Sequence, residues 1–283
     1  MRPSPRTPLL GAIACLTGLV VTGVLSHLVH EGKVRDADAL STFSRLRDTR
    51  LDGLLHSLVH IADTLPYLLL SGAVIATAIL RARPRTAFAC GVVLLCAPAS
   101  AQIIKHLTAQ PRAAMVFDHP QIDAASWPSG HSAGAMALAL CAVLVAPAVW
   151  RPVVALVGGV LAVGVGYSVV ALVWHFPSDA IGGFLLAATW TLGAVAVLRR
   201  YPDAIAEREP DAEPQRRRER VVWLVPVVTV VMFGAAALLV LGSVHVDTLT
   251  RVSQYPSAIG AAVLIAAIAA VLATVVTLSA RSS

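Results

Sequence analysis

Charged residues are scarce in this sequence and make up 13% of its 283 residues, whereas a soluble domain normally carries about 25%. Hydrophobic residues account for 57%, and the mean hydropathy is +0.76. The scarcity of charge excludes an ordinary soluble domain. Several apolar windows without an internal charge reach about eighteen residues, the length that a helix needs to cross about 30 Å of hydrocarbon. We therefore predict a polytopic membrane protein.

Cysteine is also rare, and all four copies, at positions 15, 90, 96 and 141, fall in the apolar windows. This placement indicates neither a disulfide framework nor a zinc knuckle. Since no small-x-small cleavage site ends the first window, we expect a retained span there and not a secretion signal. The arginines behind the pI near 9.6 sit mostly in short loops beside the membrane. Positive-inside topology explains them, and we expect no nucleic-acid partner.

The apolar windows predict an all-α fold, a polytopic membrane helix bundle. We expect eight spans, at 8–29, 66–81, 87–104, 132–150, 153–174, 180–198, 221–243 and 258–280. An interfacial amphipathic helix is also expected in the segment 26–64, where leucine and isoleucine recur at helical spacing between positions 51 and 61.

The order of these spans suggests three parts. Residues 1–198 form a six-helix membrane domain, and 221–283 form a C-terminal transmembrane hairpin. Between them, 199–220 is rich in Pro, Ala and alternating charge, which is typical of a cytoplasmic linker. No obligate protein partner is indicated.

The distribution of Lys and Arg predicts the orientation, because cytoplasmic loops carry an excess of both. Most basic residues fall on the side of the N-terminus, so we expect both termini in the cytoplasm and the segment 105–131 outside. High Ala, Val and Arg with only two lysines indicates a GC-rich bacterial genome. The membrane is then the plasma membrane.

A polar cluster opens the fourth predicted span, where Pro128-Ser129-Gly130-His131 follows Lys105 and Arg112. A helix N-terminus presents unpaired N–H groups and a partial positive charge, so this turn predicts an anion site. Gly130 lets the backbone approach a ligand closely. Two cations beside such a turn are suited to a phosphate.

A second cluster closes the fifth span, where His175 and Asp179 stand four residues apart across Pro177. Proline suits the first turn of the sixth span. A carboxylate near an imidazole fixes its tautomer and stabilises its charged form. Because the loops after the third and fifth spans are separated by two crossings, both clusters emerge on one side of the membrane.

The three spaced motifs, Lys105-x6-Arg112, Pro128-Ser129-Gly130-His131 and Ser168-x6-His175-x3-Asp179, resemble those of the type 2 phosphatidic acid phosphatase family of integral membrane lipid phosphatases. The resemblance covers about residues 60–200. It implies a metal-independent phosphatase without a cofactor, acting on a phosphorylated lipid such as phosphatidic acid, phosphatidylglycerol phosphate, a prenyl phosphate or a prenyl pyrophosphate.

The resemblance also implies a role for each motif residue. His175 is the nucleophile that becomes a phosphohistidine, Asp179 orients it, and His131 protonates the leaving oxygen. The remaining motif residues hold the phosphoryl oxygens: Lys105, Arg112, Ser129, Gly130 and Ser168.

Two positions depart from the family pattern. Ala113 follows Arg112 where the family has proline, and Val169 follows Ser168 where the family has a phosphate-binding arginine. Removing one transition-state donor costs about 10²–10³ in rate in oxyanion-hole deletions. An arginine from an outer loop is a possible replacement: Arg45, Arg47, Arg50 or Arg251.

Other interpretations stay open. Taken singly, Lys105 is typical of a snorkelling anchor, Ser129 of an N-cap and His175 of an interfacial residue. The chain could be a non-catalytic member that binds or moves a phosphorylated lipid, or an unrelated transporter. The spacing of His106, Asp118, His119 and Asp123 matches no recognised metal-ligand pattern, and we expect no metal.

Overall fold

The computed structural model describes residues 4–44, 52–110, 122–203 and 256–280, and within these ranges the regular structure is helical. The helices are α1 (Arg6–Leu28), α2 (His30–Phe43), α3 (Asp52–His60), α4 (Thr64–Leu80), α5 (Pro84–Leu107), α6 (Gly130–Val145), α7 (Arg151–Ala171), α8 (Pro177–Arg200) and α11 (Pro256–Ala280). The predicted all-α polytopic membrane bundle is confirmed. The predicted span 221–243 and residues 204–220 of the predicted linker lie outside the described residues.

Five of these helices, α1, α5, α7, α8 and α11, are long and apolar enough to cross a membrane. A sixth crossing is added if α3 and α4, which are bent by 53° at a short break, count as one span. The chain is thus a multi-pass membrane protein.

Helix α6 is shorter than the predicted span 132–150. It ends at Val145 because Pro147 follows, and the next residues turn, with the Trp150 N–H donating to the Pro147 carbonyl over 2.9 Å. Sixteen residues rise only about 24 Å. This helix lies at the centre of the bundle, in contact with α4, α5, α7, α8 and α11, and nearly all of its residues are buried.

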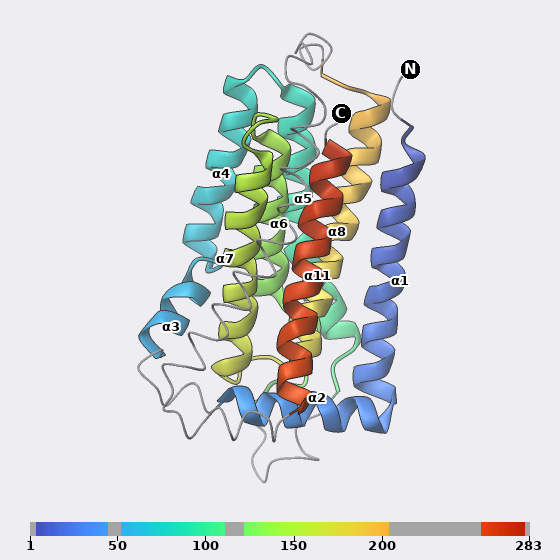
Figure 1. Ribbon diagram of the computed structural model, residues 1–283, viewed down its shortest axis with the longest axis vertical. Coiled ribbons are helices and arrows are strands. Elements are labelled where there is room, and N and C mark those ends of the chain that lie inside the picture. The colour runs from blue at the N-terminus through green and yellow to red at the C-terminus, as the bar shows by residue number, and fades with distance from the viewer. Residues whose placement is uncertain (1–3, 45–51, 111–121, 204–255, 281–283) are drawn as a thin grey trace.

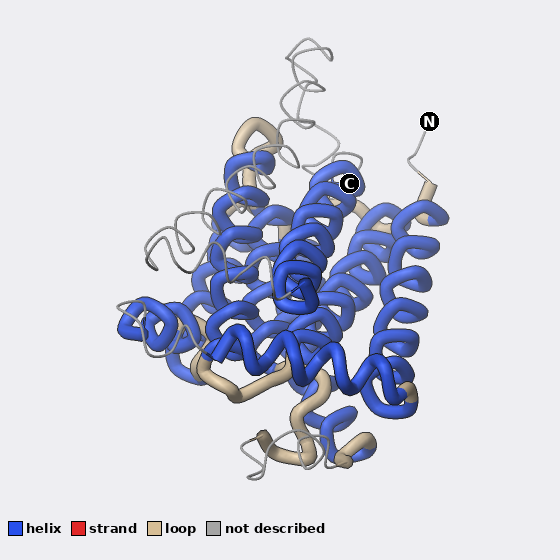
Figure 2. Tube along the Cα trace, turned by 60° about the horizontal axis from the view of Figure 1, so that its bottom comes forward, coloured by secondary structure: helices blue, strands red, loops and turns tan. Residues whose placement is uncertain are grey.

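The long helices run between two ends of the bundle, and α2 lies across the end that is lower in Figure 1. When that end is turned toward the viewer, α2 crosses in front of the other helices (Figure 2). Helix α2 is amphipathic and buries Leu40 and Phe43. Its Asp36 carboxylate accepts a 3.0 Å hydrogen bond from the Ser178 N–H in the first turn of α8. The segment 26–64 thus contains two helices: α2, which lies across the end of the bundle, and then α3.

Arginines gather at the opposite end, where α1 begins and α11 ends (Figure 1). Arg83 donates to the Leu144 carbonyl over 2.9 Å, beside the end of α6. Asp203, just after α8, accepts from the Arg85 N–H over 2.8 Å and from the Thr86 hydroxyl over 2.7 Å. These contacts fasten α5, α6 and α8 together at the end remote from α2.

Apolar side chains cover the outside of the bundle as well as its core. Leu10 on α1, Leu80 on α4 and Phe88 on α5 are 65%, 87% and 75% exposed. In water such an apolar surface would be unfavourable, and lipid tails remove that cost. The outward faces therefore fit a hydrocarbon environment.

Candidate active site

The connection between α7 and α8 holds His175 in a tight turn at the α2 end of the bundle. The carbonyl of Val169 accepts the N–H groups of Trp174 over 2.9 Å and His175 over 3.1 Å. Val173 takes a left-handed φ of 61°, which reverses the chain after α7. As a result the His175 side chain turns into the bundle, and the residue is only 6% exposed.

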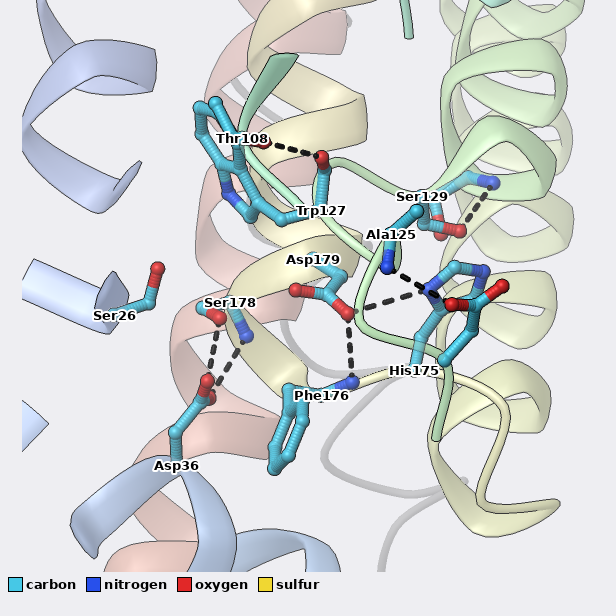
Figure 3. A network of polar contacts seen from close by, with 12 residues as sticks. Ser26, Asp36, Thr108, Ala125, Trp127, Ser129, His175, Phe176, Ser178 and Asp179 are labelled. Carbon is cyan, nitrogen blue, oxygen red and sulfur yellow. Dashed lines mark hydrogen bonds and ion pairs between the residues drawn. The ribbon is translucent and has the colours of Figure 1, made fainter. Parts of the chain in front are cut away.

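Asp179, in the first turn of α8, joins this turn to the imidazole. Its carboxylate accepts a 3.0 Å hydrogen bond from the Phe176 N–H, and the same oxygen lies 3.3 Å from His175 Nδ1 (Figure 3). Asp179 is fully buried. Because Nδ1 faces the carboxylate, Nε2 is the nitrogen left for chemistry.

The N-terminus of α6 meets the same turn of α8. Ser129 is the N-cap of α6, and its hydroxyl accepts from the Ser132 N–H over 3.3 Å. The Ser129 N–H donates to the Asp179 carbonyl over 2.9 Å. The helix start, with its unpaired N–H groups and partial positive charge, therefore lies beside the His175–Asp179 pair.

Two glycines on α8 allow this close approach. A β-carbon at Gly183 would lie 2.5 Å from the Ser129 carbonyl oxygen and 2.8 Å from the Ala133 nitrogen. A β-carbon at Gly182 would lie 2.8 Å from Trp127 Nε1. Backbone atoms of α6 thus occupy the space that any side chain at position 183 would need.

We expect Gly183→Ala to destabilise the fold by about 1–3 kcal/mol, the usual cost of overpacking, and to reduce any activity that depends on the two helix ends. Gly193→Ala is the matched control. Gly193 lies on the same helix, and a β-carbon there would meet no neighbouring atom within 4 Å. Thermal unfolding of both variants in detergent measures the difference. Equal midpoints for the two would contradict the packing argument.

Trp127 fixes the loop that leads into α6. Its indole stacks edge-on against His27 of α1, with ring centroids 5.6 Å apart, and it fills the space beside Gly23. The carbonyl of Trp127 accepts from the Thr108 hydroxyl over 3.3 Å, just after α5 (Figure 3). His27 of α1, Thr108 just after α5 and the space left by Gly182 of α8 thus set where the Ser129 turn lies.

His131 and Lys105 complete the cluster. His131 packs against the Trp174 ring, with centroids 5.7 Å apart, and the charges of His175 and Lys105 both act on its imidazole. The Lys105 ammonium in turn interacts electrostatically with Asp179 and with Asp123 in the loop before α6. A cation, two imidazoles and a helix N-terminus are thereby gathered at one end of the bundle.

His131, like His175, has a carboxylate partner, which is Asp63. Asp63 Oδ1 lies 3.3 Å from His131 Nε2, and Asp63 Oδ2 lies 2.6 Å from His60 Nδ1. The hydrogen bond with His60 holds the pKa of the Asp63 carboxyl below its ordinary value. The sequence interpretation missed this contact, because an Asp before a helix start is typical of a simple N-cap.

Two of the predicted phosphate-binding residues are not brought to this cluster by any contact described. The Ser168 hydroxyl donates to the Gly164 carbonyl over 2.8 Å inside α7 and is fully buried. Arg112 lies outside the described residues, as do the arginines considered as replacements at positions 45, 47, 50 and 251. Val169, where the family carries an arginine, is fully buried in the apolar core.

Within the described ranges, no group of three or more His, Cys, Asp or Glu side chains is arranged to hold a metal ion. Two members of the loop cluster considered above, Asp118 and His119, lie outside those ranges. The expectation of a metal-independent reaction therefore stays a prediction.

In comparisons with known proteins, residues 65–203 match the model of the PAP2 superfamily. Among solved structures, the chain is similar to a transmembrane PAP2 type phosphatidylglycerolphosphate phosphatase from Bacillus subtilis. That similarity has 18% sequence identity and a TM-score of 0.48, and it covers 72% of this chain and 99% of that chain. Comparison with curated proteins gives no match.

Proposed function

This chain belongs to the PAP2 superfamily, and from that premise we propose that it is an integral membrane phosphatase that removes a phosphate from a lipid phosphomonoester or pyrophosphate. The observation that carries the proposal is the buried pair of His175 and Asp179 beside the N-terminus of α6. An oriented imidazole next to a ready anion site is suited to nucleophilic attack on phosphorus.

In the first proposed step, Nε2 of His175 attacks phosphorus and a P–N bond forms. The P–O bond to the leaving group breaks, and His131 gives a proton to the departing oxygen. Asp179 keeps Nδ1 protonated, so that Nε2 carries the lone pair and the charge of the phosphohistidine is stabilised. The products are a phosphorylated enzyme and a lipid alcohol, or a lipid monophosphate from a pyrophosphate.

In the second proposed step, water attacks the phosphohistidine. His131, now neutral, takes a proton from the water, the P–N bond breaks, and inorganic phosphate leaves. The imidazole of His175 recovers its lone pair, so the enzyme returns to its starting state. No external acid, base or oxidant is needed to balance either step.

The phosphoryl oxygens need positive charge, because phosphoryl transfer depends mostly on positioning and charge stabilisation. Lys105 and the Gly130 N–H supply it in this proposal. The Ser129 N–H is already donated to the Asp179 carbonyl, so Ser129 contributes through its hydroxyl. Arg112 stays a predicted contributor on the same motif, and Ser168 stays a predicted contributor from α7.

The proposed side of the reaction is the extracytoplasmic face of the plasma membrane. Helix α8 begins just after His175 and ends with Arg199 and Arg200, so these two arginines lie at the opposite end of the bundle from His175. Arginines favour the cytoplasmic side. A site at the membrane boundary lets the lipid tail stay in the bilayer while the phosphate reaches the histidines.

The test is phosphate release by the purified protein in detergent from a panel of lipid monophosphates and pyrophosphates, with EDTA present. We expect release from at least one class of substrate, with a rank order that identifies the preferred lipid. Release that requires an added divalent cation would contradict the metal-independent mechanism.

A second candidate function is binding or movement of a phosphorylated lipid without turnover. The buried Val169 favours it, because the family carries a cation there. Binding of inorganic phosphate or vanadate without hydrolysis of any lipid on the panel would support this alternative over the enzyme.

Lys105→Met should lower kcat/KM for the preferred lipid by about 10²–10³, the loss seen when one transition-state donor is removed. The Lys105 ammonium interacts electrostatically with Asp179, and methionine keeps about the length of the side chain without the charge. His106→Ala is the control, since His106 is the exposed neighbour on the same turn. If the two variants keep equal activity, Lys105 is a membrane anchor and not a phosphate ligand.

A further inference from the structure

Asp63 stands at the N-cap position of α4 but does not cap the helix. Its φ of −66° and ψ of 157° are those of an N-cap, yet its side chain accepts no hydrogen bond from the first turn. The third helical residue is Pro66, which has no N–H to donate. Both carboxylate oxygens face histidines: Oδ1 is 3.3 Å from His131 Nε2, and Oδ2 is 2.6 Å from His60 Nδ1.

The break between α3 and α4 provides this geometry. The two helices meet at an angle of 53°, and the Asp63 N–H donates to the His60 carbonyl over 3.2 Å, which closes the turn. His60 ends α3 and holds one oxygen of the carboxylate, so the other oxygen is directed at α6. His131 lies 68 residues further along the chain, which makes the contact a tertiary one.

We propose that Asp63 is a positioning residue for His131, held in place by His60. The carboxylate keeps the proton of His131 on Nε2, so Nδ1 is the ring nitrogen that serves the substrate, and it favours the protonated ring that must donate to the leaving oxygen. This inference rests on the proposed phosphatase function. It assigns to His131 the kind of support that Asp179 gives to His175.

The partial exposure of the pair limits the size of the effect. The side chains of His131 and Asp63 are 30% and 41% exposed, and exposed ion pairs by themselves contribute little to stability. A role in the reaction should therefore appear in the leaving-group step more than in the stability of the fold.

The test compares two substrates with the same phosphoryl group and different leaving groups. A lipid phosphate releases an alkoxide that needs a proton, whereas p-nitrophenyl phosphate releases a phenolate that leaves without one. We expect Asp63→Asn to lower kcat/KM by about tenfold to a hundredfold for the lipid phosphate, part of the 10²–10⁴ that a general acid supplies. For p-nitrophenyl phosphate the loss should be less than about threefold, because little acid catalysis is at stake there.

Asp52→Asn is the matched control. Asp52 pairs with His56 over 3.5 Å on α3, and the side chains of Asp52 and His56 are 45% and 43% exposed. This variant should leave both substrates unchanged. In a His131→Ala background, Asp63→Asn should cause no further loss, because two residues that act through one proton donor are not additive.

An equal loss of kcat/KM on both substrates, or a full additional loss in the His131→Ala background, would overturn the inference and leave Asp63 as a structural contact. An active wild type with an unchanged substrate ratio in Asp63→Asn would overturn only the inference. A wild type that is silent on both substrates would overturn the proposed function, and the role of Asp63 with it.

Discussion

Replacing His175 with alanine should lower phosphate release by about 10⁴-fold or more, because removal of a nucleophile leaves only binding and charge stabilisation. The imidazole is buried, and its Nδ1 faces a buried carboxylate 3.3 Å away. No other described imidazole has this arrangement. His131 is paired through Nε2 with Asp63, and that carboxylate is partly exposed.

The measurement combines rate and covalent trapping. The wild type, quenched during turnover of a lipid labelled with ³²P, should carry label that is stable in base and labile in acid, as expected for a phosphoramidate. His175→Ala should carry none. His56→Ala is the control, since His56 pairs with Asp52 on the surface of α3 and should keep both rate and label. Label that persists in His175→Ala would place the nucleophile elsewhere.

The sequence could predict the fold class and most of the helix positions, because the physics is local. Long apolar windows must be helices in a bilayer, and prolines such as Pro84, Pro152 and Pro177 mark where α5, α7 and α8 begin. Ser129 as an N-cap followed from the same kind of local signal. The length of α6 was overestimated, because burial at the centre of a bundle needs no full membrane crossing.

The contacts around the histidines could be predicted only in part. The spacing of His175 and Asp179 implies their pairing, since His175 lies just before α8 and Asp179 lies in its first turn. The pairings of Asp36 with Ser178 and of Asp63 with His131 join residues 142 and 68 positions apart, and no periodicity indicates them. Such contacts depend on where α2 and the break before α4 are placed by packing.

Val169 shows how a departure from a motif can be interpreted once packing is known. The side chain is fully buried in the core, while its carbonyl holds the Trp174 and His175 N–H groups. These hydrogen bonds are made by the backbone carbonyl of Val169 and do not depend on its side chain. The turn that presents His175 is therefore kept even though the arginine is missing, and any replacement charge has to come from another element.

Asp179→Asn should separate the catalytic role of this residue from its structural one. An amide oxygen can still accept the 3.0 Å hydrogen bond from the Phe176 N–H, so the start of α8 should keep its shape. The amide cannot stabilise a charged imidazole and can favour the wrong tautomer, which lowers the rate of a histidine-dependent enzyme by about 10⁴ in the best-studied serine protease. We expect a loss of about 10³–10⁴ in kcat here.

Asp179→Ala is the matched comparison, because it removes both the carboxylate and the hydrogen-bond acceptor. Removing the acceptor of the 3.0 Å hydrogen bond from the Phe176 N–H should cost about 1–3 kcal/mol, in addition to the same loss of rate. Thermal unfolding and phosphate release should therefore distinguish the two variants. The asparagine variant should lose activity but keep most of its stability, whereas the alanine variant should lose both. If the asparagine variant turns over like the wild type, the carboxylate serves only as a helix cap and His175 is oriented by the turn alone.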